Sequence, residues 1–417
     1  MREFLLDATR LVWRAWRGRL PTGVDRVCLA YAAHFGPRSQ AVVQRKGFHF
    51  VLSSSASDQL FELLLSKTPA RRLDLVKTFA AAPAAVWSQP RPGTIYLNVG
   101  HTGLNEPSLP SWIDRHGLRA VYLIHDLIPV THPQFCREGE AEKHLRRMEN
   151  VLASASGVIG NSQATLEELA AFALARGFRM PPSVAALISA GPAPSTVQPR
   201  NLSRPHFIAV GTIEGRKNHQ LLLDIWRRLV AELGDQAPML LLVGQRGWQA
   251  EGVFEQLDEP GDLQGHVQEL RECGDAELAG WIAGARALLM PSFAEGFGLP
   301  IVEALRMGTP VIASDLPAFR EIADDIPAYA EPTDLDRWEG LVRRFMADTP
   351  ERVWQLAQMR DYVPPTWAQH FATVEAWLRS LCSIPVPQRT NFELNGPDGR
   401  LSDANHSSSA RLSNGIS

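Results

Sequence analysis

The sequence predicts an α/β protein with two domains, each built on a parallel β-sheet that helices cover on both faces. Short apolar runs alternate with longer stretches of helical spacing along the chain, and strands that alternate with helices form parallel sheets. The chain has 417 residues, of which 45% are hydrophobic. That length exceeds the roughly 250 to 300 residues that one core usually holds, which favours two domains.

The expected strands are short apolar runs that end in polar residues or glycine. In the first half they cover residues 3–9, 94–100, 120–126, 157–162 and 184–190, and in the second half residues 206–212, 239–244, 287–292 and 310–315. A helix is expected over residues 219–233, where apolar side chains recur at the spacing of one helix face.

Proline-rich composition marks residues 191–205, which hold four prolines, as a linker. We therefore expect a first domain over residues 1–190 and a second over residues 206–365. A helix should follow over residues 366–382. Residues 383–417 are rich in serine and have no apolar period, so we expect them to form a disordered tail.

Charge and cysteine content exclude several classes of protein. The net charge of -3 gives no global field for nucleic acid. The four cysteines are far apart and form no C-x-x-C pair, which argues against a disulfide framework or a zinc knuckle and favours a reducing compartment. Charged residues interrupt the apolar runs near the N-terminus, so we expect no secretory signal, no membrane span and a cytoplasmic location.

Three loops of the second half are candidates for a binding site, because ligands of parallel sheets bind beyond the carboxyl ends of the strands. One of them, residues 269–281, could hold the nucleobase through its backbone. The first loop carries Arg216 and Lys217. Two adjacent cations can hold a diphosphate, although a solvated basic pair would have the same pattern. Asn218 follows them and is expected to cap the next helix.

The second loop places a glycine turn between two carboxylates, Glu295 and Glu303. Gly296 and Gly298 allow the backbone to approach a ligand closely, and the helix that follows offers unpaired N–H groups to an anion. Carboxylates beside a phosphate would repel it unless they bind hydroxyl groups on either side. The pattern therefore favours a sugar nucleotide; the alternative is that Glu303 only complements the helix dipole and Glu295 faces water.

These two loops, "VGTIEGRKN" and "MPSFAEGFGLPIVEALRMGTPVIASD", resemble the donor-binding domain of family 4 of the glycosyltransferases. The members of this family are retaining enzymes of GT-B fold with an E-x(7)-E motif, and the resemblance covers residues 205–332. It implies two Rossmann-like domains whose parallel sheets face a central cleft. The first domain would bind the acceptor and the second the donor, and the C-terminal helix would cross back to the first domain.

The resemblance also implies roles for single residues. Arg216 and Lys217 would bind the donor diphosphate and Glu303 the ribose hydroxyls, whereas Glu295 would be catalytic and lie at the transferred sugar. The backbone beside Glu295 would contact the donor at Phe297, Gly298 and Leu299.

The first half resembles the same family more loosely. Gly23, in "LPTGVDRV", would leave room for the donor phosphates, and His125, in "YLIHDLIP", resembles the catalytic histidine that contacts the sugar. A structural histidine is the alternative at position 125. Arginines and tryptophans interleave over residues 9–21, which favours a helix packed on its own domain over peripheral contact with an anionic membrane.

No metal site is expected, because the D-x-D sequence at Asp334 and Asp336 opens a helical stretch and is typical of a helix cap. Nor is a cofactor expected besides the donor, a GDP- or UDP-linked sugar. The resemblance implies a metal-independent retaining transferase that moves a hexose, with mannose as the first choice, to a glycan or lipid-linked glycan in the synthesis of a surface polysaccharide or lipopolysaccharide. A nucleotide-sugar epimerase and a non-catalytic sugar-nucleotide-binding protein are the alternatives.

Overall fold

The computed structural model describes residues 2–18, 23–66, 72, 74–76, 88–191 and 197–383. The predicted tail therefore lies outside the described residues except for Ser383, and so does part of the predicted linker. Thr22, within the predicted glycine loop, also lies outside them.

Seven strands form the first sheet, in the order β3-β2-β1-β4-β5-β6-β7. Each neighbouring pair is parallel except β2 and β3, which form an antiparallel hairpin at one edge. The strands are β1 (Phe4–Asp7), β2 (Ser39–Arg45), β3 (Phe48–Val51), β4 (Ile95–Asn98), β5 (Arg119–Ile124), β6 (Ala155–Gly160) and β7 (Ser183–Ala185).

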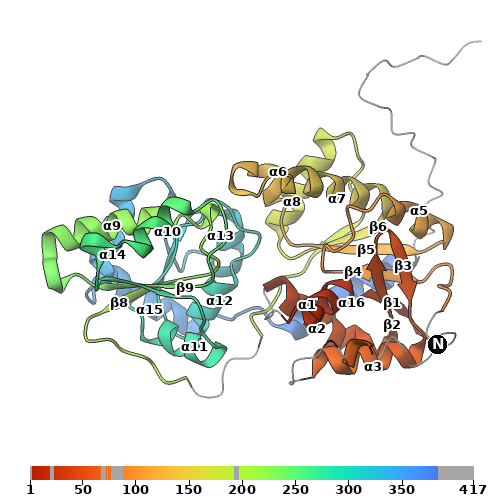
Figure 1. Ribbon diagram of the computed structural model, residues 1–417, viewed down its shortest axis with the longest axis horizontal. Helices are drawn as coiled ribbons and strands as arrows, with labels where there is room; N and C mark the ends of the chain where they lie inside the picture. The colour runs from red at the N-terminus through yellow and green to blue at the C-terminus, as the bar shows by residue number, and fades with distance from the viewer. Residues whose placement is uncertain are drawn as a thin grey trace, which may run out of the picture. The chain divides into compact units, whose positions relative to one another are not determined.

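Helices cover both faces of this sheet, as Figure 1 shows. On one face lie α1 (Thr9–Arg17), α2 (Gly23–Phe35), α3 (Ser54–Leu65) and α16 (Trp367–Ser383). On the other lie α5 (Ser108–Arg115), the short α6 (Ile128–Thr131), α7 (Glu140–Ser154) and α8 (Gln163–Ala175). A hydrophobic core lies on each face of the sheet, and alternate residues of one strand point into opposite cores. Leu6 of β1 belongs to the core that includes α2, whereas Leu5 belongs to the core that includes α5 and α7.

Six strands, all parallel, form the second sheet in the order β10-β9-β8-β11-β12-β13. They are β8 (His206–Val210), β9 (Met239–Val243), β10 (Val267–Leu270), β11 (Leu288–Met290), β12 (Val311–Ser314) and β13 (Ala328–Ala330). The helices are α9 (His219–Leu233), α10 (Glu251–Asp258), α11 (Asp275–Gly284), α12 (Leu299–Arg306), α13 (Pro317–Ala323), α14 (Leu335–Phe345) and α15 (Pro350–Gln358). Figure 1 shows α9, α10 and α14 on one face and α11, α12 and α15 on the other.

The predicted α/β class with two largely parallel sheets is confirmed. The strand predicted over residues 184–190 is wrong beyond Ala185, where β7 ends. The next two carbonyls, of Ala186 and Leu187, face Nδ1 of His370 in α16 at 3.1 and 3.3 Å. The His370 side chain therefore faces these two carbonyls, while the N–H of Ala186 still donates to the carbonyl of Gly160 in β6 at 2.9 Å.

Helix α16 packs against the first sheet, although it follows the second in sequence. Trp377 lies over Gly157 of β6, the Tyr31 hydroxyl lies 2.8 Å from Nε2 of His370, and Arg119 donates to the carbonyl of Leu381 at 3.0 Å. The domain boundaries themselves stay a prediction. None of the helices within the described ranges combines the length and apolarity needed to cross a membrane.

Replacing Gly157 by alanine should destabilise the protein by about 1 to 3 kcal/mol, the usual cost of overpacking. A Cβ there would lie 2.5 Å from the Trp377 ring. Gly252→Ala in α10 is the matched control, since a Cβ there meets nothing within 4 Å and alanine favours helix. Urea unfolding of both variants checks this; equal stabilities would contradict the described packing of α16.

Candidate functional site

A compact charged cluster lies at the carboxyl edge of the second sheet. Arg216 and Lys217 end the one-turn 3-10 helix Gly215–Lys217 that follows β8, and Glu295 lies in the loop after β11. Because β8 and β11 are neighbours in the sheet, these loops meet. One oxygen of Glu295 lies 2.8 Å from Nη1 of Arg216 and 2.5 Å from Nζ of Lys217. The structure thus brings together three of the predicted site residues.

Two further residues that the sequence analysis missed complete the cluster. The Glu214 carboxylate lies 2.5 Å from Nε of Arg216, and the Ser292 hydroxyl donates to Glu295 at 2.9 Å. Arg216 also donates to the carbonyl of Ala294 at 2.9 Å, which ties the two loops together. The only signal in the sequence is position: Glu214 comes shortly after a predicted strand, and Ser292 is the last residue of another.

The charges of this cluster balance each other in a nearly dry environment. Burial alone would raise the pKa of Glu295, but Arg216 and Lys217 lower it to about 2. Burial lowers the pKa of Lys217, and Glu295 opposes this shift. Burial also raises the pKa of Glu214, against the effect of Arg216 and Lys217. Two cations and two carboxylates thus neutralise one another, so an anionic ligand here would have to take the place of a carboxylate.

His125 lies at the end of β5 and is buried. Its Nε2 donates to the carbonyl of Val99 at 2.9 Å, so its Nδ1 remains as an acceptor. Burial lowers its pKa, which favours the neutral ring. The carbonyl of His125 accepts from Nδ2 of Asn161 at 2.8 Å and lies against Gly296, where a Cβ would come within 2.0 Å of that oxygen. His125 therefore lies directly beside the predicted glycine turn.

The glycine turn presents the N-terminus of α12. Gly298 precedes that helix with a φ of 108°, and a Cβ there would lie 2.8 Å from the Phe319 ring. A side chain at position 298 is thus excluded by both backbone conformation and space. The Phe297 side chain is buried in the core, which leaves its backbone, with those of Gly298 and Leu299, as the part that a ligand could reach.

Gly23 and Glu303 lie on the two sides of a contact between α2 and α12. A Cβ at Gly23 would be 3.6 Å from the Leu299 side chain. Arg26, one turn further along α2, lies 3.3 Å from Glu303 and donates to Asp275 at 2.8 Å. Burial raises the pKa of Glu303, and Arg26 opposes this shift. Arg26 was not predicted, and its position one turn after Gly23 is the only signal for it.

Two predicted helix caps have different outcomes. Asn218 precedes α9 in the left-handed conformation, and its side chain donates to the carbonyl of Pro332 at 2.8 Å instead of capping the helix, so that prediction is wrong. Asp334 does cap α14, by accepting from the backbone N–H of Arg337 at 2.9 Å, and Asp336 pairs with Arg228. Among the described residues, no group of three or more His, Cys, Asp or Glu side chains could hold a metal ion.

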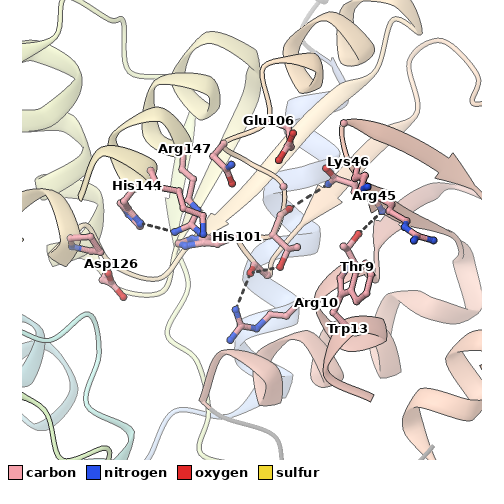
Figure 2. A pocket seen from close by; sticks show the side chains of 18 of the residues that line it. Thr9, Arg10, Trp13, Arg45, Lys46, His101, Glu106, Asp126, His144 and Arg147 are labelled. Carbon is pink, nitrogen blue, oxygen red and sulfur yellow. Dashed lines mark hydrogen bonds between the residues drawn. The ribbon is translucent and has the colours of Figure 1, made fainter. Parts of the chain in front are cut away.

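A pocket of about 780 Å³ opens beside the carboxyl ends of β1, β4 and β5 (Figure 2). Asp126, the neighbour of His125, lies on its wall together with Trp248 from the second half. The sequence analysis did not predict it, because its walls come from α1, the β2–β3 hairpin, the loop after β4 and α7. The remaining lining residues are Thr9, Arg10, Trp13, Gln44, Arg45, Lys46, Gly47, Gly100, His101, Thr102, Gly103, Asn105, Glu106, Pro129, Lys143, His144 and Arg147.

Solved structures share this arrangement of two sheets. HepE of Anabaena, crystallised with UDP, aligns with a TM-score of 0.60 over 91% of this chain and 100% of its own, at 16% identity. A sucrose-phosphate synthase from Thermosynechococcus elongatus aligns with a TM-score of 0.59 over 91% of this chain and 99% of its own, at 18% identity. The predicted GT-B fold, that of two-domain glycosyltransferases, is thereby confirmed.

Residues 204–348 match the family described as "Glycosyl transferases group 1", so the second half of the chain is a glycosyltransferase group 1 domain. The cluster of Arg216, Lys217 and Glu295 lies within it. Among curated proteins, the serotype-specific mannosyltransferase WbdA of Escherichia coli is 30% identical over 52% of this chain and 28% of its own length. The O-antigen chain mannosyltransferase B of Escherichia coli is 36% identical over 34% of this chain and 37% of its own. The chain thus matches about a third of the length of these relatives.

Replacing Glu295 by glutamine should destabilise the protein by about 3 to 5 kcal/mol, because two buried cations would then lie side by side with one carboxylate left. The second change in Glu295→Gln/Lys217→Met should restore part of this loss. Denaturant unfolding of the two single variants and the double variant measures the coupling; strictly additive effects would contradict the ion pair.

The ion pairs of Glu295 should make the stability of the protein depend on pH in the acid range. The folded-state pKa of Glu295 is lowered from 4.5 to about 2, so its stabilising effect is full above pH 4.5 and is lost as the pH falls toward 2. The difference in unfolding free energy between the wild type and Glu295→Gln should therefore shrink over this range. A difference that stays constant from pH 6 to the lowest pH at which both proteins fold would argue against the lowered pKa.

Proposed function

We propose that the protein is a retaining glycosyltransferase that moves a hexose from a nucleoside diphosphate sugar to a glycan or lipid-linked glycan in surface polysaccharide synthesis. The observation that carries this proposal is the convergence of Arg216, Lys217 and Glu295 beside the glycine turn and His125, inside a glycosyltransferase group 1 domain. The names of the matched relatives, O-antigen and serotype-specific mannosyltransferases, support the polysaccharide setting.

Mannose from a GDP-linked donor is the first choice for the sugar. The support comes from the matched relatives, whose names specify mannosyl transfer. A UDP-linked donor is the second choice, because HepE was crystallised with UDP and with UDP-glucose. No metal or other cofactor enters the proposed reaction.

The proposed mechanism follows from exchange of partners in the charged cluster. The donor diphosphate binds Arg216 and Lys217 and takes the place of the Glu295 carboxylate. Glu295, released from the cations, then accepts hydrogen bonds from hydroxyls of the transferred sugar, while Glu303 binds the ribose. As the sugar leaves, charge grows on the diphosphate, where the two cations and the N-terminus of α12 stabilise it. These groups neutralise the leaving group without a divalent ion.

The acceptor is proposed to bind in the pocket next to His125. Asp126 lies in the pocket wall and is the neighbour of His125 in sequence, so an acceptor hydroxyl at this end lies closest to the proposed reaction centre. We place the reaction in the cytoplasm, at the inner face of the membrane. In α1, Arg10 and Arg14 pair with Asp25, so the membrane contact is assigned to the partly exposed Trp16 and to Arg17.

Nucleotide binding and turnover together test this function. GDP, and UDP less strongly, should raise the melting temperature of the full chain, because a ligand that binds only the folded state stabilises it. Arg216→Met should abolish this shift, whereas Arg271→Gln, which removes an exposed arginine of the same half, should retain it. With GDP-mannose, release of GDP should then depend on an added mannose oligosaccharide.

Each alternative would give a different result in these assays. A nucleotide-sugar epimerase would convert the donor without an acceptor. A non-catalytic binding protein would show the thermal shift without nucleotide release in any mixture. The absence of a shift with both nucleotides would refute the donor site itself.

Changing Glu303 to glutamine should weaken GDP binding by roughly tenfold, since hydrogen bonds to a charged group contribute about 1.5 to 3 kcal/mol. Glu277→Gln, at an exposed acid in α11, is the matched control and should bind GDP like the wild type. Isothermal titration calorimetry measures both constants. An unchanged affinity for Glu303→Gln would show that Glu303 does not bind the ribose.

A further inference from the structure

The pocket beside His125 has a strongly cationic lining. Five basic residues and two acidic ones, Glu106 and Asp126, contribute to its walls; the basic residues are Arg10, Arg45, Lys46, Lys143 and Arg147. The first 200 residues carry 23 basic and 15 acidic side chains, and residues 201–417 carry 19 and 30, so the pocket lies in the more basic half of the chain. The positive charge of its lining is part of this wider excess of positive charge in the first half.

Within the pocket, the basic residues differ in how their charges are compensated. Arg10 pairs with Asp25 at 2.6 Å, and Lys143 pairs with Glu140 at 3.1 Å. Arg147 lies 3.8 Å from the same Glu140, and its buried Nε has no hydrogen-bond acceptor among the described residues. Burial lowers the pKa of Arg147, although Glu140 and Asp126 act to raise it.

Arg45 and Lys46 are exposed at the end of the β2–β3 hairpin and form no ion pair with an acid in the described part of the chain. Figure 2 shows them at the opposite end of the pocket from Asp126, with Arg10 and His101 between. The pocket therefore has one end next to the proposed reaction centre and a distant end with two cations that form no ion pair in the described part of the chain. The Glu106 carboxylate also lies at this distant end, 3.8 Å from where a Cβ of residue 47 would be.

The turn of this hairpin holds Lys46 in the left-handed conformation. Lys46 and Gly47 have φ angles of 49° and 78°, as in a two-residue type I′ turn, where asparagine, aspartate or glycine is preferred to lysine. The Ser108 hydroxyl fixes this turn by donating to the carbonyl of Gly47 at 2.8 Å. His101, on another wall, is also left-handed, with a φ of 57°. Strained residues gather at ligand sites, because binding and not stability maintains them.

We propose that this pocket binds an acceptor that carries a phosphate ester, with the phosphate at the Arg45 and Lys46 end and the accepting hydroxyl at the Asp126 end. This inference rests on the proposed transferase function and deepens it, since it specifies the chemical class of the acceptor. An arginine fork and a lysine point charge together suit a phosphate. The volume of about 780 Å³ is within the usual range for small-molecule sites.

Direct binding tests this proposal on the full chain, with saturating GDP to fill the donor site. Octyl α-mannoside and octyl mannosyl phosphate differ only in the phosphate, and mannose 1-phosphate lacks the alkyl chain. We expect octyl mannosyl phosphate to bind on the order of tenfold more tightly than octyl α-mannoside, given two exposed ion pairs, and the preference to fall at higher salt. Binding of mannose 1-phosphate as well assigns the site to soluble phosphates, and its failure assigns the site to lipid-linked ones.

The double variant Arg45→Gln/Lys46→Asn should remove the preference for the phosphate and leave the binding of octyl α-mannoside unchanged. Asparagine suits the left-handed turn, so this variant should fold at least as stably as the wild type. Arg115→Gln, which removes an exposed arginine of α5 outside the pocket, is the matched control and should retain the preference.

Three results would overturn the proposal: equal affinity for the two octyl compounds, a double variant that keeps the preference, or tighter binding of a mannuronate, which would indicate a carboxylate acceptor. Failure of the transferase function is distinguishable from these. It would appear as loss of GDP binding or of nucleotide release, whereas the acceptor proposal fails only in the comparison of the two octyl compounds.

Discussion

The ion pair between Glu295 and the cations Arg216 and Lys217 is the interaction on which the rest of the site depends. It joins the loops after two neighbouring strands of the second sheet at a point where burial makes each unpaired charge costly. The Glu295 carboxylate holds both cations, so they are ordered before any ligand binds. A ligand that takes over these contacts enters a site that is already organised, and its cost in conformational entropy is correspondingly smaller.

Backbone contacts extend this order from the second half to the first. Gly296 lies against the carbonyl of His125, and the Ser162 hydroxyl donates to the carbonyl of Gly296 at 3.1 Å. The imidazole of His125 is oriented independently, by the Val99 carbonyl. The ring of this histidine is thus oriented by a main-chain carbonyl, and its backbone is held by the side chain of Asn161 and the close approach of Gly296.

The class of fold and the second-half cluster could be predicted from the sequence because both depend on local patterns. Strand ends, the adjacent cations and the glycine turn each occupy a few consecutive residues. Strands β2, β3, β10 and β13 were missed, since the first three mix polar and apolar residues and β13 is a short run between Pro327 and Pro332. Glu214 and Arg26 were missed for different reasons: Glu214 is an ordinary acid that pairs with Arg216 in its own loop, and the partners of Arg26 come from other helices.

The pocket could not be predicted from the sequence, because the residues that form it are brought together only by the fold. Its walls come from segments between residues 9 and 147 and from Trp248, and its charge becomes visible only when these segments meet. The left-handed conformation of Lys46 could not be predicted either, because a Lys-Gly sequence occurs in turns with and without a positive φ at the lysine. The roles of the individual site residues remain predictions that the proposed experiments address.

Arg26 has a consequence of its own. It belongs to α2, yet its guanidinium contacts Glu303, one turn into α12, and Asp275 at the start of α11. A ligand that binds the Glu303 carboxylate would break its contact with Arg26. The free energy of ligand binding is therefore linked to the free energy of the contact between α2 and α12. Linkage is reciprocal: a substitution that strengthens the hold of Arg26 on Glu303 would make the protein a poorer nucleotide binder, even though it never touches the nucleotide.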